Sequence, residues 1–247
     1  MRVLAIVHPS GAGPGVFVDP IRASGAELHC WRLSDEGPPW CDPLDYDAVL
    51  TLGGATHPDD EDRHPWLAEE KALLADLLGR RVPLLAVGLG AQLLCEAAGA
   101  PPRRAGEPEL GWHSVELTQA ASRDPVLGPL APRFDALQWH SYELRLPPGA
   151  TALARSASCL QAFEVADAAW GIQFRAEVTL EQVESWLDDR RSNDDALAPD
   201  LTAYELRSDT RWRIAAWNEL GRGVCQRFLE EAKASRRRRP RLRVHRR

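Results

Sequence analysis

Residues 83–94 of the chain read Pro-Leu-Leu-Ala-Val-Gly-Leu-Gly-Ala-Gln-Leu-Leu. The apolar run at 83–87 predicts a buried strand, and the residues after the glycines have helical spacing. A strand that turns sharply into a helix has the layout of a nucleophile elbow, whose backbone N–H groups can hold an oxyanion. The residue at the apex of such an elbow should be serine or cysteine. Here it is Gly88, which has no side chain that could attack a substrate.

Around this elbow, the first half of the chain alternates short apolar runs with helical patterns. The predicted strands are residues 3–7, 27–32, 47–52 and 83–87. The predicted helices are residues 20–26, 65–79 and 91–98. Strands that alternate with helices indicate a parallel sheet joined by right-handed crossovers.

The second half of the chain has a different texture. Short strand candidates separated by Pro, Gly and Ser lie at residues 114–118, 136–139, 152–156, 160–165 and 169–174. They favour antiparallel pairing that either continues the same sheet or adds a small one. Helical patterns follow at 180–190, 212–220 and 224–234, with a polar loop over 188–200.

The charge of the chain is divided unevenly. The 247 residues hold 30 basic and 36 acidic side chains, for a net charge of −6, yet residues 235–247 hold eight arginines and no acid. Residues 1–234 therefore hold 22 basic against 36 acidic side chains, a net charge of −14. This division excludes a globally basic nucleic-acid binder and confines any such role to the tail. We expect the tail to be disordered, to contact an acidic partner or nucleic acid, or to fold back on the acidic body.

Cysteine spacing and hydropathy narrow the setting of the protein. The five cysteines are odd in number and widely spaced, and no pair has the spacing of a metal or redox motif. No apolar run approaches the roughly 18–20 residues of a membrane span, and the N-terminus lacks the features of a signal peptide. We therefore expect a cytoplasmic protein that has no metal site and no membrane contact.

Several motifs together resemble those of class I glutamine amidotransferases, the Cys-His-Glu glutaminase family, and in particular stand-alone bacterial members that are similar to the glutaminase domain of GMP synthase. The matching motifs are Gly53-Gly54, residues 86–93, Trp139-His140, residues 146–150 and residues 170–177. The resemblance covers nearly all of residues 47–186. It implies an α/β fold with a mixed, largely parallel central sheet flanked by helices, a flavodoxin-like arrangement of three layers.

The resemblance also implies roles for particular residues. Gly53 and Gly54 match the loop that forms the oxyanion hole, and the Leu89 N–H matches its second donor. Gln92 and His140 match residues near the substrate pocket. Each has a plainer interpretation as well, because Gly53-Gly54 could simply end a strand, Gln92 could brace the helix, and His140 could make a structural hydrogen bond. No cofactor is implied.

The departures from the family pattern fall where its chemistry takes place. Gly88 stands at the position of the nucleophilic cysteine, Arg175 stands at the position of the histidine base, and Ala176 replaces a proline. An arginine stays protonated at neutral pH and cannot accept a proton. Only Glu177, the third member of the triad, remains. Arg175 could bind a carboxylate or phosphate, or it could pair with Glu177 and plug the cavity, and we favour the plug.

Three hypotheses follow from these residues. The first is a pseudo-glutaminase that binds a ligand with a carboxylate or amide, or that regulates a pathway enzyme. The second is an active transferase or hydrolase with a non-standard site at Arg175, Glu177 and His140. The third is an interaction protein that acts through its arginine tail. The chain has no Gly-x-x-x-x-Gly-Lys-Ser/Thr loop, so any synthetase would be a separate chain.

The expected organisation divides the chain into three parts. Residues 1–190 form the amidotransferase-like domain, residues 191–234 form a helical C-terminal extension packed on it, and residues 235–247 form the tail. In the extension, Trp212 and Trp217 are candidates for a partner surface. Cys95 is expected to be a buried, inert thiol rather than a displaced nucleophile.

Overall fold

The structure, a computed structural model, describes residues 1–9, 13–35, 39, 41–188 and 203–238. Nine strands form one sheet in the order β2-β1-β3-β4-β9-β8-β7-β5-β6. The strands are β1 (Arg2–Ile6), β2 (Glu27–Trp31), β3 (Ala48–Thr51), β4 (Leu84–Val87), β5 (Arg103–Leu117), β6 (Arg133–Glu143), β7 (Thr151–Arg155), β8 (Leu160–Val165) and β9 (Ala169–Ile172). The sequence predicts a strand at each of these nine places.

Five strands make the parallel half of the sheet. β2, β1, β3, β4 and β9 pair in parallel, and the connections between the first four of them carry the predicted helices. The helices of the chain are α1 (Val18–Ala23), α2 (Trp66–Gly79), α3 (Leu89–Ala97), α4 (Leu180–Asp188) and α5 (Ala203–Arg238). The prediction of an α/β fold with a largely parallel centre is confirmed.

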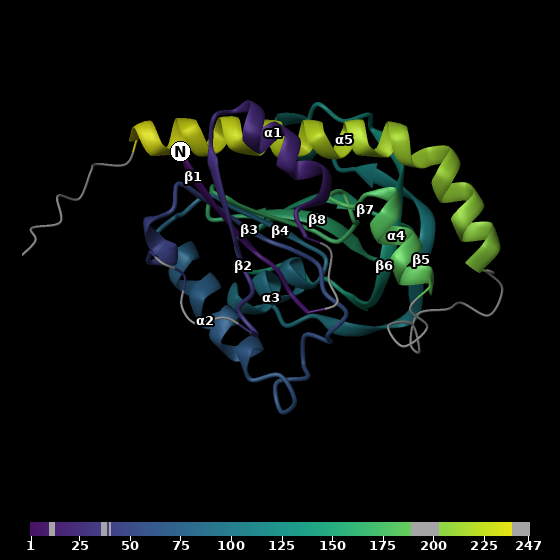
Figure 1. The fold of residues 1–247 in the computed structure, drawn as a ribbon, viewed down its shortest axis with the longest axis horizontal. Coiled ribbons are helices and arrows are strands. Elements are labelled where there is room, and N and C mark those ends of the chain that lie inside the picture. Colours follow the sequence, from purple (N-terminus) through teal and green to yellow (C-terminus); the bar gives the residue numbers. More distant parts are fainter. Residues whose placement is uncertain (10–12, 36–38, 40, 189–202, 239–247) are drawn as a thin grey trace, which may run out of the picture.

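The helices cover both faces of this parallel half. Side chains of a strand alternate between faces, so Leu85 and Val87 of β4 enter one core while Leu84 and Ala86 enter the other. The first core is completed by side chains of α1, α4 and α5, and the second by side chains of α2 and α3. In Figure 1, α1 and α5 lie along the upper side of the molecule, and α2 and α3 lie below. The result is the three-layer arrangement that the sequence predicts.

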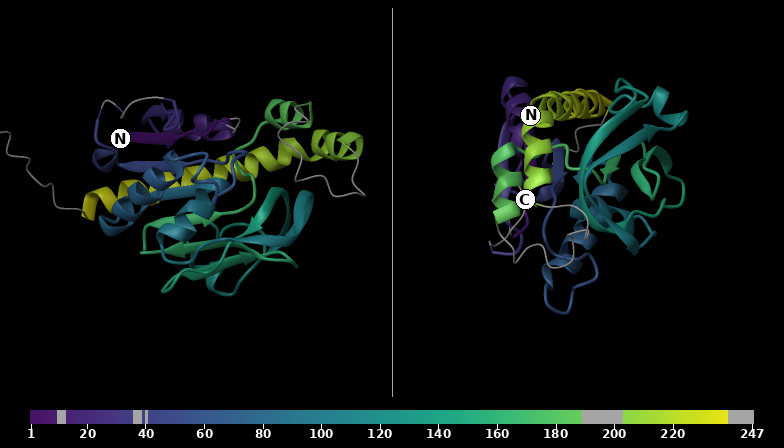
Figure 2. Two further views of the ribbon diagram at one scale, coloured as in Figure 1. Left: turned by 90° about the horizontal axis from the view of Figure 1, so that it is seen from below. Right: turned by 90° about the vertical axis from the view of Figure 1, so that its right-hand side faces the viewer.

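The antiparallel half continues the same sheet. β8, β7, β5 and β6 pair antiparallel to one another, and β8 pairs antiparallel to β9. This half curves strongly, as the right-hand view of Figure 2 shows, and Leu144 at the end of β6 forms an isolated bridge with Leu160 of β8. β5 begins at Arg103, well before the predicted start at 114, because its first residues are mostly exposed and carry little apolar pattern.

The C-terminal helix differs from the prediction. The sequence predicts separate helices at 212–220 and 224–234, with the glycines between them as a break, whereas α5 runs unbroken over 36 residues. A side chain at Gly221 would overlap with the carbonyl oxygen of Ala176. Gly221 therefore allows α5 to approach the strand end closely, which is a packing requirement rather than a helix stop.

The arginine-rich tail also begins later than expected. α5 continues through Arg238, so the first four residues assigned to the tail are helical, and residues 239–247 lie outside the described residues. Nε of Arg236 lies 3.1 Å from Oδ1 of Asp47, next to the N-terminal strands. At this residue, the end of the helix folds back on the acidic body.

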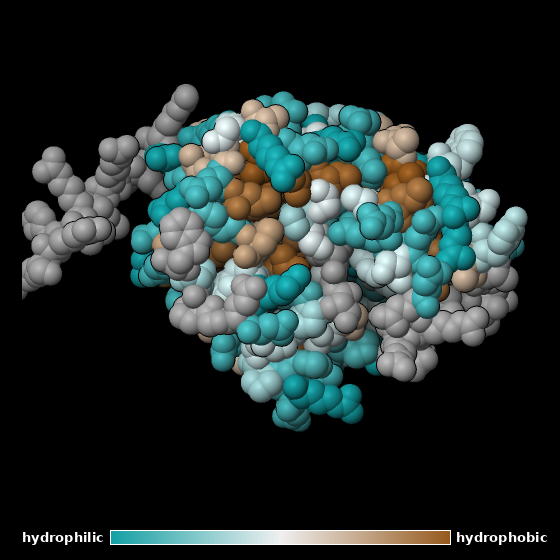
Figure 3. Space-filling view, in the orientation of Figure 1, coloured by the Kyte–Doolittle hydropathy of each residue, from teal (hydrophilic) through white to brown (hydrophobic). Residues whose placement is uncertain are grey.

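The described helices include none that is long and apolar enough to cross a membrane. On the face shown in Figure 3, hydrophilic residues cover most of the surface and hydrophobic residues are visible between them in separate groups. Trp212 is 86% exposed on α5, whereas Trp217 is buried. The prediction that both tryptophans mark a partner surface is therefore wrong for Trp217.

Candidate functional site

The turn between β4 and α3 has the backbone geometry of a strand-to-helix elbow. Gly88 forms this turn with φ 56° and ψ −117°, a conformation that costs side-chain-bearing residues free energy. Its N–H donates to the carbonyl of Ile172 at 2.9 Å, and its carbonyl accepts from the N–H of Gln92 at 3.0 Å. A side chain at Gly90 would overlap with the carbonyl of Thr51 at the end of β3. Both glycines are thus required by the turn and by its close packing.

The loop after β3 approaches this elbow. A Cβ atom on Gly54 would lie 2.8 Å from Cβ of His8 and 3.0 Å from Cδ2 of Leu89. A Cβ atom on Gly53 would overlap with the guanidinium of Arg175. The two glycines therefore allow three side chains to pack directly against the loop backbone.

The backbone of Arg175 is held from two sides, just after β9. Its N–H donates to the carbonyl of Leu137 in β6 at 2.9 Å. Its carbonyl accepts a hydrogen bond of 2.8 Å from the indole Nε1 of Trp217 in α5. These bonds fix the point from which the Arg175 side chain enters the protein.

The side chain of Arg175 is buried and paired. Its Nε donates to Oε1 of Glu177 at 2.8 Å, and its Nη2 lies 2.6 Å from the same oxygen, outside hydrogen-bonding geometry. Its Cζ atom lies 4.4 Å from the centre of the Trp186 ring on α4, a cation–π contact. Arg175 is 4% exposed and Glu177 is fully buried. Because Glu177 neutralises the guanidinium, little of its charge remains for a second anion.

Arg175 fills the space in front of the elbow. A Cβ atom on Gly88 would lie 3.4 Å from Cδ of Arg175 and 3.4 Å from Cα of Gly53. The structure thus brings together Gly53, Gly88, Arg175 and Glu177, four of the residues named by the sequence. Gly54 and Leu89 pack beside them, and Gln92 is buried one turn into α3.

His140 takes part in a different group of residues. Its Nε2 lies 3.1 Å from Oε2 of Glu109, which is opposite it on β5. Its neighbour on β6, Trp139, packs on Trp186 at 5.1 Å, and adjacent side chains of a strand point to opposite faces. His140 is therefore directed away from the aromatic wall on which Arg175 lies.

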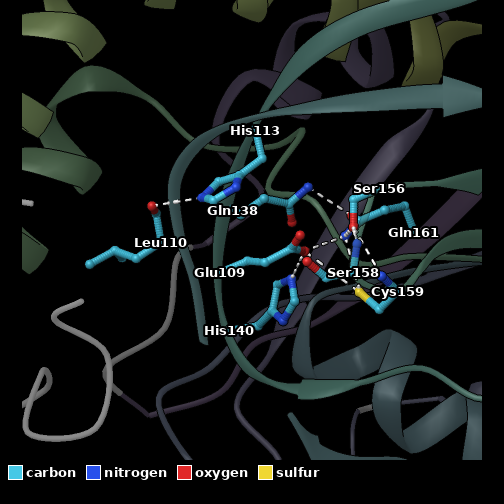
Figure 4. A network of polar contacts seen from close by, with 9 residues as sticks. All are labelled: Glu109, Leu110, His113, Gln138, His140, Ser156, Ser158, Cys159 and Gln161. Carbon is cyan, nitrogen blue, oxygen red and sulfur yellow. Dashed lines mark hydrogen bonds and ion pairs between the residues drawn. The ribbon is translucent and has the colours of Figure 1, made fainter. Parts of the chain in front are cut away.

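Glu109 is the centre of this second group, which Figure 4 shows from close by. Its Oε2 accepts from Nε2 of Gln161 at 2.7 Å and from Sγ of Cys159 at 3.6 Å, as well as facing His140. Gln161 in turn accepts from Nε2 of Gln138 at 2.7 Å. All five side chains belong to buried residues. They come from three strands and one loop, which is why no local motif in the sequence reveals them.

The environment shifts the pKa values in this group. Burial alone would raise the pKa of Glu109, but hydrogen bonds from His140 and Ser156 outweigh burial and lower its pKa to about 2. Burial and the nearby Glu109 charge raise the pKa of Cys159 to about 12. The predicted buried thiol, Cys95, likewise has its pKa raised to about 12 by burial, and it donates to the carbonyl of Arg145.

A third buried polar group lies at the end of β1. Nε2 of His8 lies 2.7 Å from Oε2 of Glu70, and the hydroxyl of Thr51 donates to Oε1 of Glu70 at 2.5 Å. The His8 ring stacks on Trp66 with centroids 5.2 Å apart. Sequence reasoning missed Glu70, since a lone glutamate in an amphipathic helix gives no signal of burial.

Similar solved structures support the fold. A glutamine amidotransferase from Thermotoga maritima is 24% identical, with a TM-score of 0.82, and the match covers 93% of this chain and 98% of that chain. A glutamine amido transferase from Methylobacillus flagellatus is 25% identical, with a TM-score of 0.80, and the match covers 93% and 94% of the two chains.

Sequence comparison points the same way. The glutamine amidotransferase-like protein YfeJ of Salmonella typhimurium is 28% identical over 238 residues, which are 94% of this chain and 97% of that protein. The class-I glutamine amidotransferase family matches residues 17–190, which include the elbow, the glycine loop and the Arg175–Glu177 pair. The chain therefore belongs to the class-I glutamine amidotransferase family.

Proposed function

We propose that this chain is a catalytically impaired member of its family, a pseudo-glutaminase that acts by binding or regulation rather than by amide hydrolysis. One observation carries the proposal: the Arg175 guanidinium occupies the space between Gly53 and Gly88 and is paired with Glu177. Amide hydrolysis by the family route needs a thiolate activated by a nearby base. Gly88 supplies no thiol, and Arg175 cannot accept a proton.

The alternative of an active site built from Arg175, Glu177 and His140 has less support. Glu177 is committed to the buried ion pair, and His140 is paired with Glu109 instead. A general base must reach the proton that it removes, and neither side chain is directed at an open space in front of Gly88. Turnover that disappears in Glu177→Gln would nevertheless favour this alternative.

A separate protein is the partner that the family relationship favours. Among the structural neighbours are a GMP synthase glutaminase-type subunit from Thermoplasma acidophilum, 18% identical with a TM-score of 0.65, and PurLQS from Thermotoga maritima, 12% identical with a TM-score of 0.56. These likenesses concern the fold. We propose a synthetase or another pathway enzyme on a separate chain as the partner, in the cytoplasm. An interaction through the arginine tail is less favoured at Arg236, which binds Asp47 of the same chain.

The proposal is tested by ammonia release from glutamine. The wild-type chain should give background rates, and measurable wild-type turnover would contradict the proposal. The double variant Gly88→Cys with Arg175→His restores the thiol and the base. Its labelling by an electrophilic glutamine analogue would show that the glutamine pocket persists behind the plug.

The matched control is Gly88→Ala with Arg175→His, which carries the same backbone strain and the same base without a thiol. Labelling confined to the cysteine variant identifies residue 88 as the nucleophile position. If neither variant is labelled while both remain folded, the pocket itself has diverged, and the proposed function would be binding of a ligand other than glutamine.

A further inference from the structure

We propose that Glu109, His140 and Cys159 form a binding site for a thiophilic divalent cation, best represented by Zn²⁺. The inference is independent of the pseudo-glutaminase proposal. Within the described residues, these three side chains each offer one ligand atom, and all three atoms lie within 4.8 Å of one another. Cysteine, histidine and glutamate are the ligand types that zinc sites use.

The separations of the ligand atoms fit tetrahedral coordination. Zinc bonds of about 2.0–2.3 Å place a nitrogen and an oxygen ligand about 3.4 Å apart, and a sulfur and an oxygen ligand about 3.6 Å apart. The corresponding distances here are 3.1 Å from His140 Nε2 to Glu109 Oε2 and 3.6 Å from Cys159 Sγ to Glu109 Oε2. Small side-chain rotations would therefore place all three ligands around one ion.

The surroundings of the three ligands resemble an outer coordination shell. Gln161 donates to Glu109 at 2.7 Å, and Gln138 donates to Gln161 at 2.7 Å, so the carboxylate is held in place by a chain of two amides. Such partners orient metal ligands in known sites. His140 Nδ1 and Gln138 Oε1 are buried without a hydrogen-bond partner among the described residues, which is unusual for a finished structural network.

The charges of the group also suit a divalent cation. Binding converts the Cys159 thiol to a thiolate, and the proton goes to solvent. The thiolate and the Glu109 carboxylate then carry two negative charges, His140 remains neutral, and the ion balances them. The mixture of one soft, one intermediate and one hard ligand favours Zn²⁺ or Co²⁺ over Mg²⁺ or Ca²⁺. Three protein ligands leave one position for water or a bound molecule.

The test is a titration of the full chain with Co²⁺ and then Zn²⁺ after treatment with a chelator. We expect one ion per chain by elemental analysis, an absorption band from thiolate to cobalt, and displacement of that band by zinc. Cys159→Ala should abolish the band. Cys95→Ala is the matched control, since it removes another buried thiol, and it should keep the band.

A second variant guards against loss of folding. Glu109→Gln keeps the size of the side chain and most of its hydrogen bonds but removes the anionic ligand, so zinc affinity should fall at least tenfold while circular dichroism stays unchanged. The proposal is overturned if the wild-type chain retains no ion, or if the cobalt spectrum is the same in Cys159→Ala and Cys95→Ala. Unchanged zinc affinity in folded Glu109→Gln would also overturn it.

Discussion

Nε of Arg175 donates to Oε1 of Glu177 at 2.8 Å, and this ion pair is almost completely removed from solvent. Buried charges are costly when they lose their partner, so each residue protects the fold from the charge of the other. The pair also places the guanidinium against Gly53, where it blocks the space next to the elbow. One contact thus bears on both stability and the loss of activity that we propose.

A double-mutant cycle should reveal this mutual protection. We expect Arg175→Met and Glu177→Gln each to lower the free energy of unfolding by about 3–5 kcal/mol, because each leaves one buried charge unpaired or one acceptor lost. The double variant should be more stable than the sum of the two effects predicts. Urea unfolding monitored by fluorescence measures all four proteins, and simple additivity would show that the pair is not coupled.

The close approach of Arg175 to Gly53 predicts a steric effect. Gly53→Ala should lower the free energy of unfolding by about 1–3 kcal/mol, since its methyl group would overlap with the guanidinium. Gly79→Ala is the control, because no atom lies within 4 Å of a Cβ there and alanine favours the helix that ends at Gly79. Thermal unfolding should therefore shift in opposite directions in the two variants, and equal shifts would contradict the packing described here.

Two glycines of α5 make a second matched pair. Gly221→Ala should destabilise the protein by about 1–3 kcal/mol, because its methyl group would overlap with the carbonyl of Ala176. Gly223→Ala meets only the flexible end of the Arg227 side chain, at 3.0 Å, and should be neutral or stabilising. Differential scanning calorimetry of both variants checks this. A large loss in both would show that α5 requires helix-breaking glycines and not close packing.

Glu164 predicts a pH dependence of stability. Burial raises its pKa, and the charge of Asp167 raises it further, while Oε1 is buried without a hydrogen-bond partner among the described residues. The folded state therefore holds the proton more tightly than the unfolded state, whose pKa is about 4.3. The resulting penalty on folding is fully present above the folded pKa and disappears as the pH falls below the unfolded pKa.

Glu164→Gln removes that penalty and should raise the melting temperature at pH 7–8, with a gain that shrinks towards pH 3.5. Glu116→Gln, which neutralises an exposed strand carboxylate, should leave the melting temperature nearly unchanged at both pH values. Melting temperatures measured from pH 3.5 to 8 check both variants. A gain that persists at pH 3.5 would show that the effect of Glu164→Gln is not electrostatic.

The amino-acid sequence by itself determined the order of the elements and the place of the elbow. Alternating apolar patterns report burial on one face of a strand, and a glycine between a strand and a helix reports a turn, so residues 83–94 locate this feature without a structure. The motif match also identified Gly53, Gly88, Arg175 and Glu177, and the structure brings these four residues together.

Only the tertiary structure decided the relations that depend on distant segments. Glu109, His140 and Cys159 are far apart in the chain and meet because the antiparallel strands curve until β6 reaches β8. Gly221 reads as a helix break in the sequence, yet its role depends on a carbonyl 45 residues away, that of Ala176. Local patterns record the conformational preference and burial of each segment, but the partners of a buried polar group are fixed by packing between segments, which no local pattern encodes.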